Sequence, residues 1–146
     1  MKGSRQFRAT LSELDSMMKW VREALQQCSI DSRQAKQFAL AVEEALVNVI
    51  YYAYDYPSGI VEVVYAKEQD KVFFSVKDKG VAFNPLENAK PVDRESPLEK
   101  RIEGGLGIHF ILNMTDSTEY QRKEGWNILT LTQRLSKSVD DSHKSC

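Results

Sequence analysis

Apolar residues recur at helical spacing early in the chain, three or four positions apart, and this predicts a first helix that continues through Cys28. The positions concerned are Leu14, Met17, Met18, Val21 and Leu25. Thr10 and Glu13 have the spacing of a capping box, so we expect the helix to begin there. The residues before it, 5–10, read as a short first strand.

A second periodic stretch predicts a longer helix from Asp31 to about Tyr54. Asp31 and Gln34 have capping-box spacing at its start, and the turn residues from Tyr56 to Gly59 end it. Six apolar positions fall within one arc when each residue advances about 100° around the helix, and this arc is expected to face the core. The six are Phe38, Val42, Ala45, Leu46, Val49 and Ala53.

Alternating apolar and polar residues then predict two strands, over residues 60–66 and 71–77, joined by a polar turn. Val72, Phe74 and Val76 would share one face of the second strand. Because a polar turn joins them directly, we expect these strands to lie side by side.

The second half of the chain predicts a loop, a helix and a hairpin. Residues 84–103 are charged, contain three prolines and lose their periodicity, which predicts a long loop with a helical turn near Leu86. A helix is expected over residues 107–114, followed by a hairpin of residues 117–123 and 126–134. The whole order of elements predicts an α+β fold, with helices on one face of a mixed, mainly antiparallel sheet.

Length and composition fit one domain. The chain has 146 residues, 42% of them hydrophobic and 28% charged, so we expect a domain over residues 1–135 and a disordered, serine-rich tail over residues 136–146. The net charge of −1 gives no general attraction to nucleic acid or anionic lipid. We also expect no membrane span and no secretory signal. Cys28 and Cys146 offer neither a disulfide framework nor a metal-ligand spacing, so the expected location is the cytoplasm.

Glu44 and Asn48 are the first candidates for chemistry. They lie four residues apart on the second predicted helix, so their side chains emerge on the same side, one turn apart. An amide oxygen is a hard ligand that suits Mg²⁺, which takes most of its other ligands from water and phosphates. A carboxylate one turn earlier can accept a proton from a hydroxyl. Taken alone, the pair also fits a solvated helix face.

Asp78 and Gly80 end the second of the paired strands. An aspartate there can accept a hydrogen bond from an exocyclic amino group such as that of adenine, and a glycine lets the backbone approach a flat ligand closely. An ordinary Asp-x-Gly turn has the same sequence.

A glycine cluster, Gly104-Gly105-Leu106-Gly107, opens the predicted helix of residues 107–114. Free backbone N–H groups at a helix start favour phosphate binding. No Gly-Lys-Ser/Thr follows the cluster and no strand leads into it, so it is neither a Walker loop nor a dinucleotide-binding turn.

Together, in this order, the three motifs resemble those of GHKL ATPases, the family that includes gyrase, Hsp90, histidine kinases and MutL. The segment from Glu44 to Asn48 resembles their N box, the segment from Asp78 to Phe83 their G1 box, and the segment from Gly105 to Gly107 their G2 box. Residues 103–111 and 125–131 are similar to the anti-sigma-factor serine kinases of the RsbW and SpoIIAB types. The resemblance covers roughly residues 7–135.

The resemblance implies a Bergerat-type ATP-binding fold and a role for each matched residue. Asn48 would be the Mg²⁺ ligand and Glu44 the general base. Asp78 would bind the adenine amino group, with Gly80 beneath the ring. Ala82, Phe83, Gly104, Gly105, Leu106 and Gly107 complete the implied nucleotide-binding set. The loop of residues 84–103 would close over the ATP as a lid.

Two features depart from the pattern. Ala82 stands where many family members have glycine, and no residue is an obvious partner of the γ-phosphate. Lys100 and Arg101 are candidates by their position in the loop, and Arg94 is a weaker one.

The resemblance implies a serine/threonine protein kinase with two protein partners. One is a STAS-domain anti-anti-sigma factor that is phosphorylated, and the other is an RNA polymerase sigma factor that is sequestered. Such kinases are commonly homodimers. A nucleotide-gated binding module with little or no kinase activity is the alternative, and an unrelated α+β protein would have no affinity for adenine nucleotides. The tyrosines at 51, 52, 54 and 56 would either form a partner surface or pack beside the core or a ligand.

Overall fold

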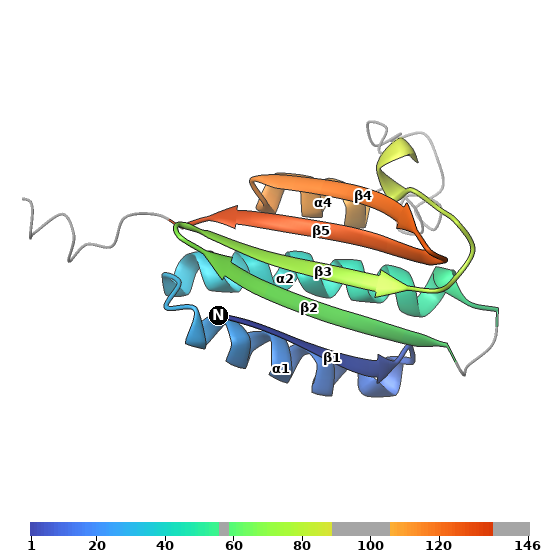
Figure 1. Ribbon diagram of the computed structural model, residues 1–146, viewed down its shortest axis with the longest axis horizontal. Coiled ribbons are helices and arrows are strands. Elements are labelled where there is room, and N and C mark those ends of the chain that lie inside the picture. The colour runs from blue at the N-terminus through green and yellow to red at the C-terminus, as the bar shows by residue number, and fades with distance from the viewer. Residues whose placement is uncertain (56–58, 89–105, 136–146) are drawn as a thin grey trace, which may run out of the picture.

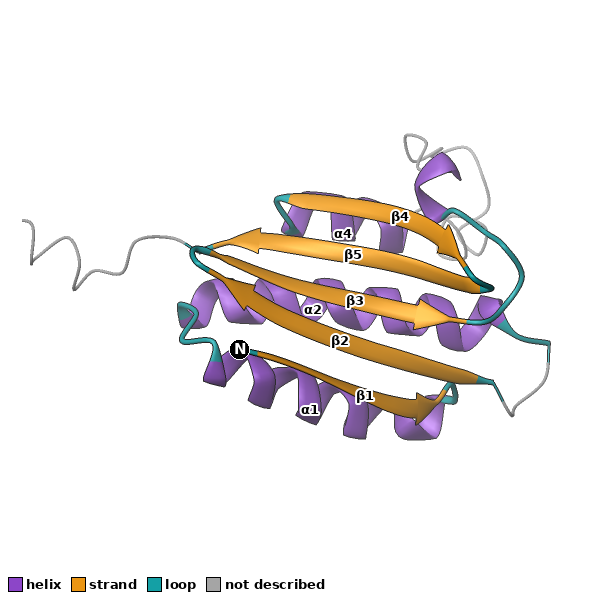
Figure 2. Cartoon of the chain, viewed as in Figure 1, coloured by secondary structure: helices purple, strands orange, loops and turns teal. Residues whose placement is uncertain are grey.

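The computed structural model describes residues 1–55, 59–88 and 106–135 (Figure 1). Within these ranges five strands form one sheet in the order β1-β2-β3-β5-β4, and the helices α1, α2 and α4 all lie on one of its faces (Figures 1 and 2). The predicted α+β fold is therefore confirmed. Every pairing between the described strands is antiparallel, so the sheet is not mixed.

The strands follow the alternation of the sequence closely. Their bounds are β1 Lys2–Arg8, β2 Ile60–Glu68, β3 Lys71–Asp78, β4 Ser117–Lys123 and β5 Trp126–Arg134. The hairpin of β4 and β5 has the predicted bounds, and Glu124 and Gly125 both have positive φ, as a two-residue hairpin turn requires. The first strand was expected at residues 5–10 but spans Lys2–Arg8, because it pairs with β2 from Lys2, opposite Ala66, to Arg8, opposite Ile60.

The helices differ from the sequence expectation mainly at their starts. Thr10 makes no side-chain cap, so the first capping box was wrong: a 3₁₀ turn, η1 (Leu11–Glu13), comes first, and α1 spans Leu14–Gln27. Asp31 does cap α2 (Ser32–Asn48), and its Oδ2 accepts a hydrogen bond from the Gln34 N–H at 3.3 Å. After α2 the chain continues as a π-helical turn, η2 (Val49–Ala53), which ends one residue before the predicted end at about Tyr54.

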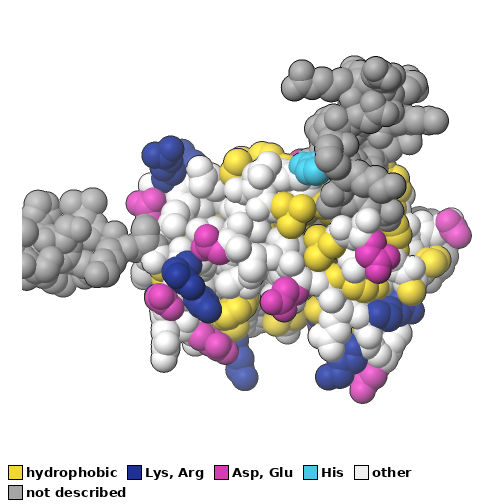
Figure 3. All heavy atoms as spheres, turned by 90° about the horizontal axis from the view of Figure 1, so that it is seen from above, with side chains coloured by type: hydrophobic (Ala, Val, Ile, Leu, Met, Phe, Trp, Pro, Cys, Tyr) yellow, Lys and Arg dark blue, Asp and Glu magenta, His cyan; other side chains and the backbone are white. Residues whose placement is uncertain are grey.

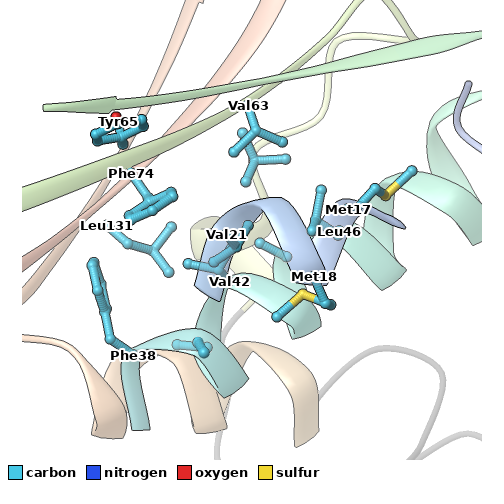
Figure 4. Close-up of a cluster of buried hydrophobic side chains, with 14 of the residues drawn as sticks. Met17, Met18, Val21, Phe38, Val42, Leu46, Val63, Tyr65, Phe74 and Leu131 are labelled. Atoms are coloured by element: carbon cyan, nitrogen blue, oxygen red, sulfur yellow. The ribbon is translucent and has the colours of Figure 1, made fainter. Parts of the chain in front are cut away.

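The core lies between the three helices and the covered face of the sheet. Figure 4 shows side chains of α1 and α2 pointing toward residues of β2, β3 and β5. The Phe38 ring packs edge-on against the Phe74 ring, with their centroids 5.6 Å apart. The Phe74 ring stacks on the Tyr65 ring, with their centroids 5.8 Å apart. Val72, Phe74 and Val76 share the buried face, as predicted. Of the six core positions predicted on the second helix, five are buried and Ala53 is half-buried.

The second half of the chain is described only in part. A 3₁₀ turn, η3 (Pro85–Asn88), lies where a helical turn near Leu86 was predicted, and α4 spans Leu106–Met114, one residue longer than expected. The remainder of the predicted loop, with Arg94, Lys100 and Arg101, lies outside the described residues. So do Gly104, Gly105, Tyr56 and the tail of residues 136–146.

The surface is mixed in charge, and the helices α1 and α2 carry polar side chains on their exposed faces. Basic and acidic side chains are interspersed over the face seen in Figure 3, in keeping with a net charge of −1. No helix in the described ranges has the length and apolar character needed to cross a membrane.

Candidate functional site

A cleft of about 390 Å³ opens between the end of α2, the end of β3, α4 and the β4–β5 hairpin. Its volume is within the range of small-molecule sites, and its lining is mostly apolar with a few polar groups, as in such sites generally. The lining residues are Ala45, Asn48, Val49, Tyr52, Ala53, Val76, Asp78, Val81, Ala82, Phe83, Pro85, Ile108, Tyr120, Asn127 and Leu129. Four of the sequence-predicted site residues, Asn48, Asp78, Ala82 and Phe83, are therefore gathered at one cleft.

Asp78 is the acidic residue among those that line the cleft, and it is almost fully buried, with 7% of its surface exposed. Its Oδ1 accepts two hydrogen bonds, one from the Gly80 N–H at 2.8 Å and one from Asn127 Nδ2 at 2.9 Å. Oδ2 accepts none from any of the described residues. The carboxylate thus has one oxygen held by the protein and one available to a donor in the cleft.

Gly80 lies where the chain leaves β3 and passes against the end of η2. A side-chain carbon on Gly80 would overlap the carbonyl oxygen of Ala53, so only glycine allows this approach of two backbone segments. The sequence interpretation expected the close approach to be to a ligand. The structure shows a close approach to Ala53, which fixes the position of the Asp78–Gly80 turn beside the cleft, and the approach of a ligand to Gly80 stays a prediction.

Asn127 is the residue that the sequence interpretation missed. It stands directly opposite Asp78 in the β3–β5 ladder and is 7% exposed. Besides Asp78, it binds the carbonyl of Val81 through Nδ2 at 2.9 Å, and its Oδ1 accepts hydrogen bonds from the Phe83 N–H at 3.3 Å and from the Tyr120 hydroxyl. The available signal was alternation: Asn127 occupies the face of β5 that otherwise carries Leu129 and Leu131.

Two long side chains, Arg122 and Tyr54, also form hydrogen bonds with the backbone of residues 79–83. Arg122 Nη1 donates to the Gly80 carbonyl at 2.9 Å. The Tyr54 hydroxyl accepts from the Lys79 N–H at 2.7 Å and donates to the Ile60 carbonyl at 2.6 Å. Val81 and Phe83 nevertheless remain largely exposed at the rim of the cleft.

Glu44 and Asn48 meet α4 at Gly107. A side-chain carbon on Gly107 would lie 3.1 Å from Glu44 Oε2 and 3.9 Å from Asn48 Oδ1. The three residues, which come from two separate sequence motifs, are thus brought together at the start of α4. Asn48 lines the cleft and Glu44 stands beside it, outside the lining set. Burial raises the pKa of Glu44 above its ordinary value, and the negative charge of Glu43 adds to the effect.

The tyrosine cluster divides between several environments. Tyr52 lines the cleft, Tyr54 packs against the hydrophobic core, and Tyr51 and Tyr52 are both more than half exposed. The rings of Tyr51 and Tyr52 lie 6.3 Å apart. The structure therefore places Tyr54 beside the core and Tyr52 beside a potential ligand.

The described residues fit a magnesium nucleotide better than a metal bound by the protein alone. No group of three or more His, Cys, Asp or Glu side chains in the described ranges could hold an ion. Mg²⁺ needs only one or two protein ligands when phosphates supply the rest, and Asn48 offers an amide oxygen at the cleft. Gly107 and the backbone of Leu106 begin a nine-residue helix beside Asn48, where free N–H groups favour an anion.

Comparison with known proteins gives consistent matches. A family model described as the histidine kinase-like ATPase domain matches residues 7–133. Proteins named serine-protein kinase RsbW from Bacillus mycoides (strain KBAB4) and Bacillus cereus (strain AH187) are each 30% identical to this chain over 93 residues. Each alignment covers 62% of this chain and 58% of the relative, so the chain matches less than two thirds of the length of these relatives.

A solved structure supports the fold. The RsbU and RsbW domains of Rv1364c from Mycobacterium tuberculosis match with a TM-score of 0.65 and 20% identity, over 94% of this chain and 33% of that chain. At this identity the match shows a shared fold.

Proposed function

This chain belongs to the histidine kinase-like ATPase domain family, and on that premise we propose that it is a serine/threonine protein kinase and anti-sigma factor. In this proposal it uses Mg-ATP to phosphorylate a STAS-domain anti-anti-sigma factor, and it sequesters an RNA polymerase sigma factor. The relatives named serine-protein kinase RsbW support the choice of branch. The observation that carries the proposal is the meeting of Glu44, Asn48 and Gly107 beside a cleft that contains Asp78.

The adenine would occupy the apolar part of the cleft. Asp78 would accept a hydrogen bond from the exocyclic amino group, because its Oδ1 is already held by Gly80 and Asn127 and its Oδ2 is available. Ala82 and Phe83 would flank the base. The phosphates would extend toward the start of α4, where Gly104, Gly105, Leu106 and Gly107 belong to the proposed binding set.

Phosphoryl transfer would then depend mainly on positioning. The hydroxyl oxygen of the partner's serine or threonine forms a bond to the γ-phosphorus, the bond from that phosphorus to the bridging oxygen breaks, and ADP leaves. Glu44 accepts the hydroxyl proton, and its raised pKa makes it a stronger base than an exposed glutamate. Asn48 would contribute an oxygen to the Mg²⁺ that neutralises the charge on the phosphates.

The remaining parts of the proposal concern the whole chain. Residues 1–135 would form one ATP-binding domain, whereas most of the expected lid and the whole of the expected tail lie outside the described residues. The protein would act in the cytoplasm as a homodimer, with no direct contact to nucleic acid or membrane.

A nucleotide-gated binding module with little or no kinase activity is the second candidate. The observation in its favour is the position of Glu44, which stands beside the cleft but does not line it. In such a module the bound nucleotide would select the protein partner, and no phosphate would move.

The test is phosphoryl transfer measured by intact-mass spectrometry. The purified protein is incubated with Mg-ATP and each STAS-domain protein from the same genome, with Glu44→Gln and Glu43→Gln run in parallel. Glu43 lines a separate groove between α1 and α2 and makes only the smaller contribution to the raised pKa of Glu44, so Glu43→Gln removes a neighbouring charge while keeping the proposed base. We expect one added phosphate on one partner, retained with Glu43→Gln and slowed about 10²-fold or more with Glu44→Gln.

If no partner gains mass while Mg-ATP still binds, the kinase assignment is wrong and the nucleotide-gated module replaces it. Phosphorylation at an equal rate with Glu44→Gln would remove Glu44 from its proposed role as the base.

A further inference from the structure

We propose that Asn127 is a positioning residue that sets the base selectivity of the cleft by holding Asp78 so that one carboxylate oxygen is left for the base. The inference rests on the proposed binding of an adenine nucleotide. It concerns how this chain orients its own aspartate, and it makes Asn127 the residue that connects the β4–β5 hairpin to Asp78.

The hydrogen-bonding capacity of Asn127 is fully used within the chain. An asparagine side chain offers two N–H donors and an oxygen with two lone pairs. Both donors are occupied, by Asp78 Oδ1 and by the Val81 carbonyl, each at 2.9 Å. The oxygen accepts from the Phe83 N–H and from the Tyr120 hydroxyl. Asn127 therefore has no remaining donor or acceptor for a ligand, and any effect on binding must act through the groups that it holds.

The most important of these groups is Asp78. With Oδ1 held by the Gly80 N–H and by Asn127, rotation of the carboxylate would break two hydrogen bonds in a site that is 7% exposed. Breaking such bonds in a buried site is costly, because an unpaired buried polar group loses its partner without regaining water. Oδ2 is consequently presented as a fixed, charged acceptor, which suits an amino group at position 6 of a purine and repels a carbonyl there.

Asn127 also fixes the backbone on which the base would rest. It binds Val81 and Phe83, which are two residues apart in the segment that follows Asp78. The same side chain thus sets both the acceptor and the wall of the cleft, and the strand ladder places it opposite Asp78. A residue with only one donor could not hold Asp78 and Val81 together.

The experiment compares ATP with purine riboside 5′-triphosphate, which lacks only the 6-amino group, by isothermal titration calorimetry in the presence of Mg²⁺. For the wild type we expect ATP to bind about tenfold to a hundredfold more tightly, the range for a hydrogen bond to a charged group. In Asn127→Leu the ratio of the two dissociation constants should fall below about threefold. Asn127→Thr offers a single hydroxyl donor in place of the amide, so it should give an intermediate ratio. This variant replaces Asn127→Leu in the experiment if the leucine variant does not fold.

The control is Thr130→Val, which removes a 2.8 Å hydrogen bond to Ser75 from the same strand pair, three residues farther along β5 and on the opposite face of the sheet. Its ratio should equal that of the wild type. A merely structural Asn127 would weaken both ligands equally and leave the ratio unchanged in Asn127→Leu and Asn127→Thr, and this result would overturn the inference. A wild-type ratio near one would also overturn it while leaving nucleotide binding intact, whereas binding of neither ligand would overturn the proposed function itself.

Discussion

Glu44 combines a proposed chemical role with a position that disfavours its charge. Burial, aided by the neighbouring Glu43, raises its pKa above the ordinary value of 4.5. A carboxyl group whose pKa is raised by folding favours the folded state below the ordinary value, and this contribution is lost as the pH rises through the raised value. The charged form is therefore a source of instability at neutral pH, as is common for residues kept for function.

Glu44→Gln should accordingly raise the melting temperature at pH 8, because glutamine has the same shape and no charge to bury. The increase should shrink as the pH falls and disappear below 4.5, where Glu44 becomes protonated in both the folded and the unfolded protein. Thermal unfolding followed by circular dichroism across this range measures the difference, with the exposed Glu23→Gln on α1 as control. An increase that is the same at both ends of the pH range would contradict a buried charge at Glu44.

Gly107 is the other residue whose chemistry depends on close contact. Alanine at this position should not destabilise the protein, since it favours a helix over glycine by about 1 kcal/mol. The added carbon would nevertheless lie 3.1 Å from Glu44 Oε2 and displace it by a few tenths of an ångström. Misplacement of a catalytic group on this scale costs about tenfold or more in rate.

Gly107→Ala should thus leave urea stability equal or higher while phosphoryl transfer falls about tenfold. The matched variant is Asn113→Ala, an exposed position of the same helix, for which both properties should stay near or above those of the wild type. Unchanged transfer in Gly107→Ala would mean that the contact with Glu44 has no role in the reaction.

At the scale of elements, the cleft depends on the packing of η2 against the turn that ends β3. The π-helical turn places the Ala53 carbonyl where only glycine at residue 80 can pass. Helical periodicity predicted this helix and an end at about Tyr54, but it gives no signal for a π turn or for a backbone contact between residues 27 positions apart. The contact requires the three-dimensional arrangement.

Gly80→Ala should therefore destabilise the fold by about 1–3 kcal/mol, the range for overpacking, since the obstacle is backbone and cannot rotate away. Urea unfolding measures the change, and the exposed neighbour Val81→Ala should shift stability by less than about 0.5 kcal/mol. Equal stability of Gly80→Ala and the wild type would show that the turn can move away from Ala53 without cost.

The elements differ in how far the sequence determines them. Both strands of the β4–β5 hairpin were predicted to the residue, because alternation and the Glu124-Gly125 turn agree there. The start of the first helix was wrong, because a favourable Thr10 and Glu13 spacing does not reveal that a 3₁₀ turn comes first. Local patterns therefore predicted the existence of each element more accurately than the residue at which it begins.

At the scale of the whole molecule, the antiparallel sheet brings distant motifs to one place. Asp78 and Asn127 are neighbours because β3 pairs with β5, and Glu44 meets Gly107 because α4 packs beside α2. The order of the motifs allowed Glu44, Asp78 and Gly107 to be identified as candidates from the sequence. Asn127 could be identified only from the register of the strands. The family assignment and the lining of the cleft both support the proposal that this cleft binds the nucleotide.

The most direct test of this account is calorimetric titration of the protein with Mg-ATP, comparing the wild type with Asp78→Asn. Asparagine can still accept the hydrogen bonds from Gly80 and Asn127, but it presents a donor instead of an acceptor to the base. The account predicts one ATP per chain for the wild type and an affinity at least tenfold weaker for Asp78→Asn. Absence of binding to the wild type, or equal affinity in the two proteins, would contradict the assignment of this cleft as an adenine-nucleotide site.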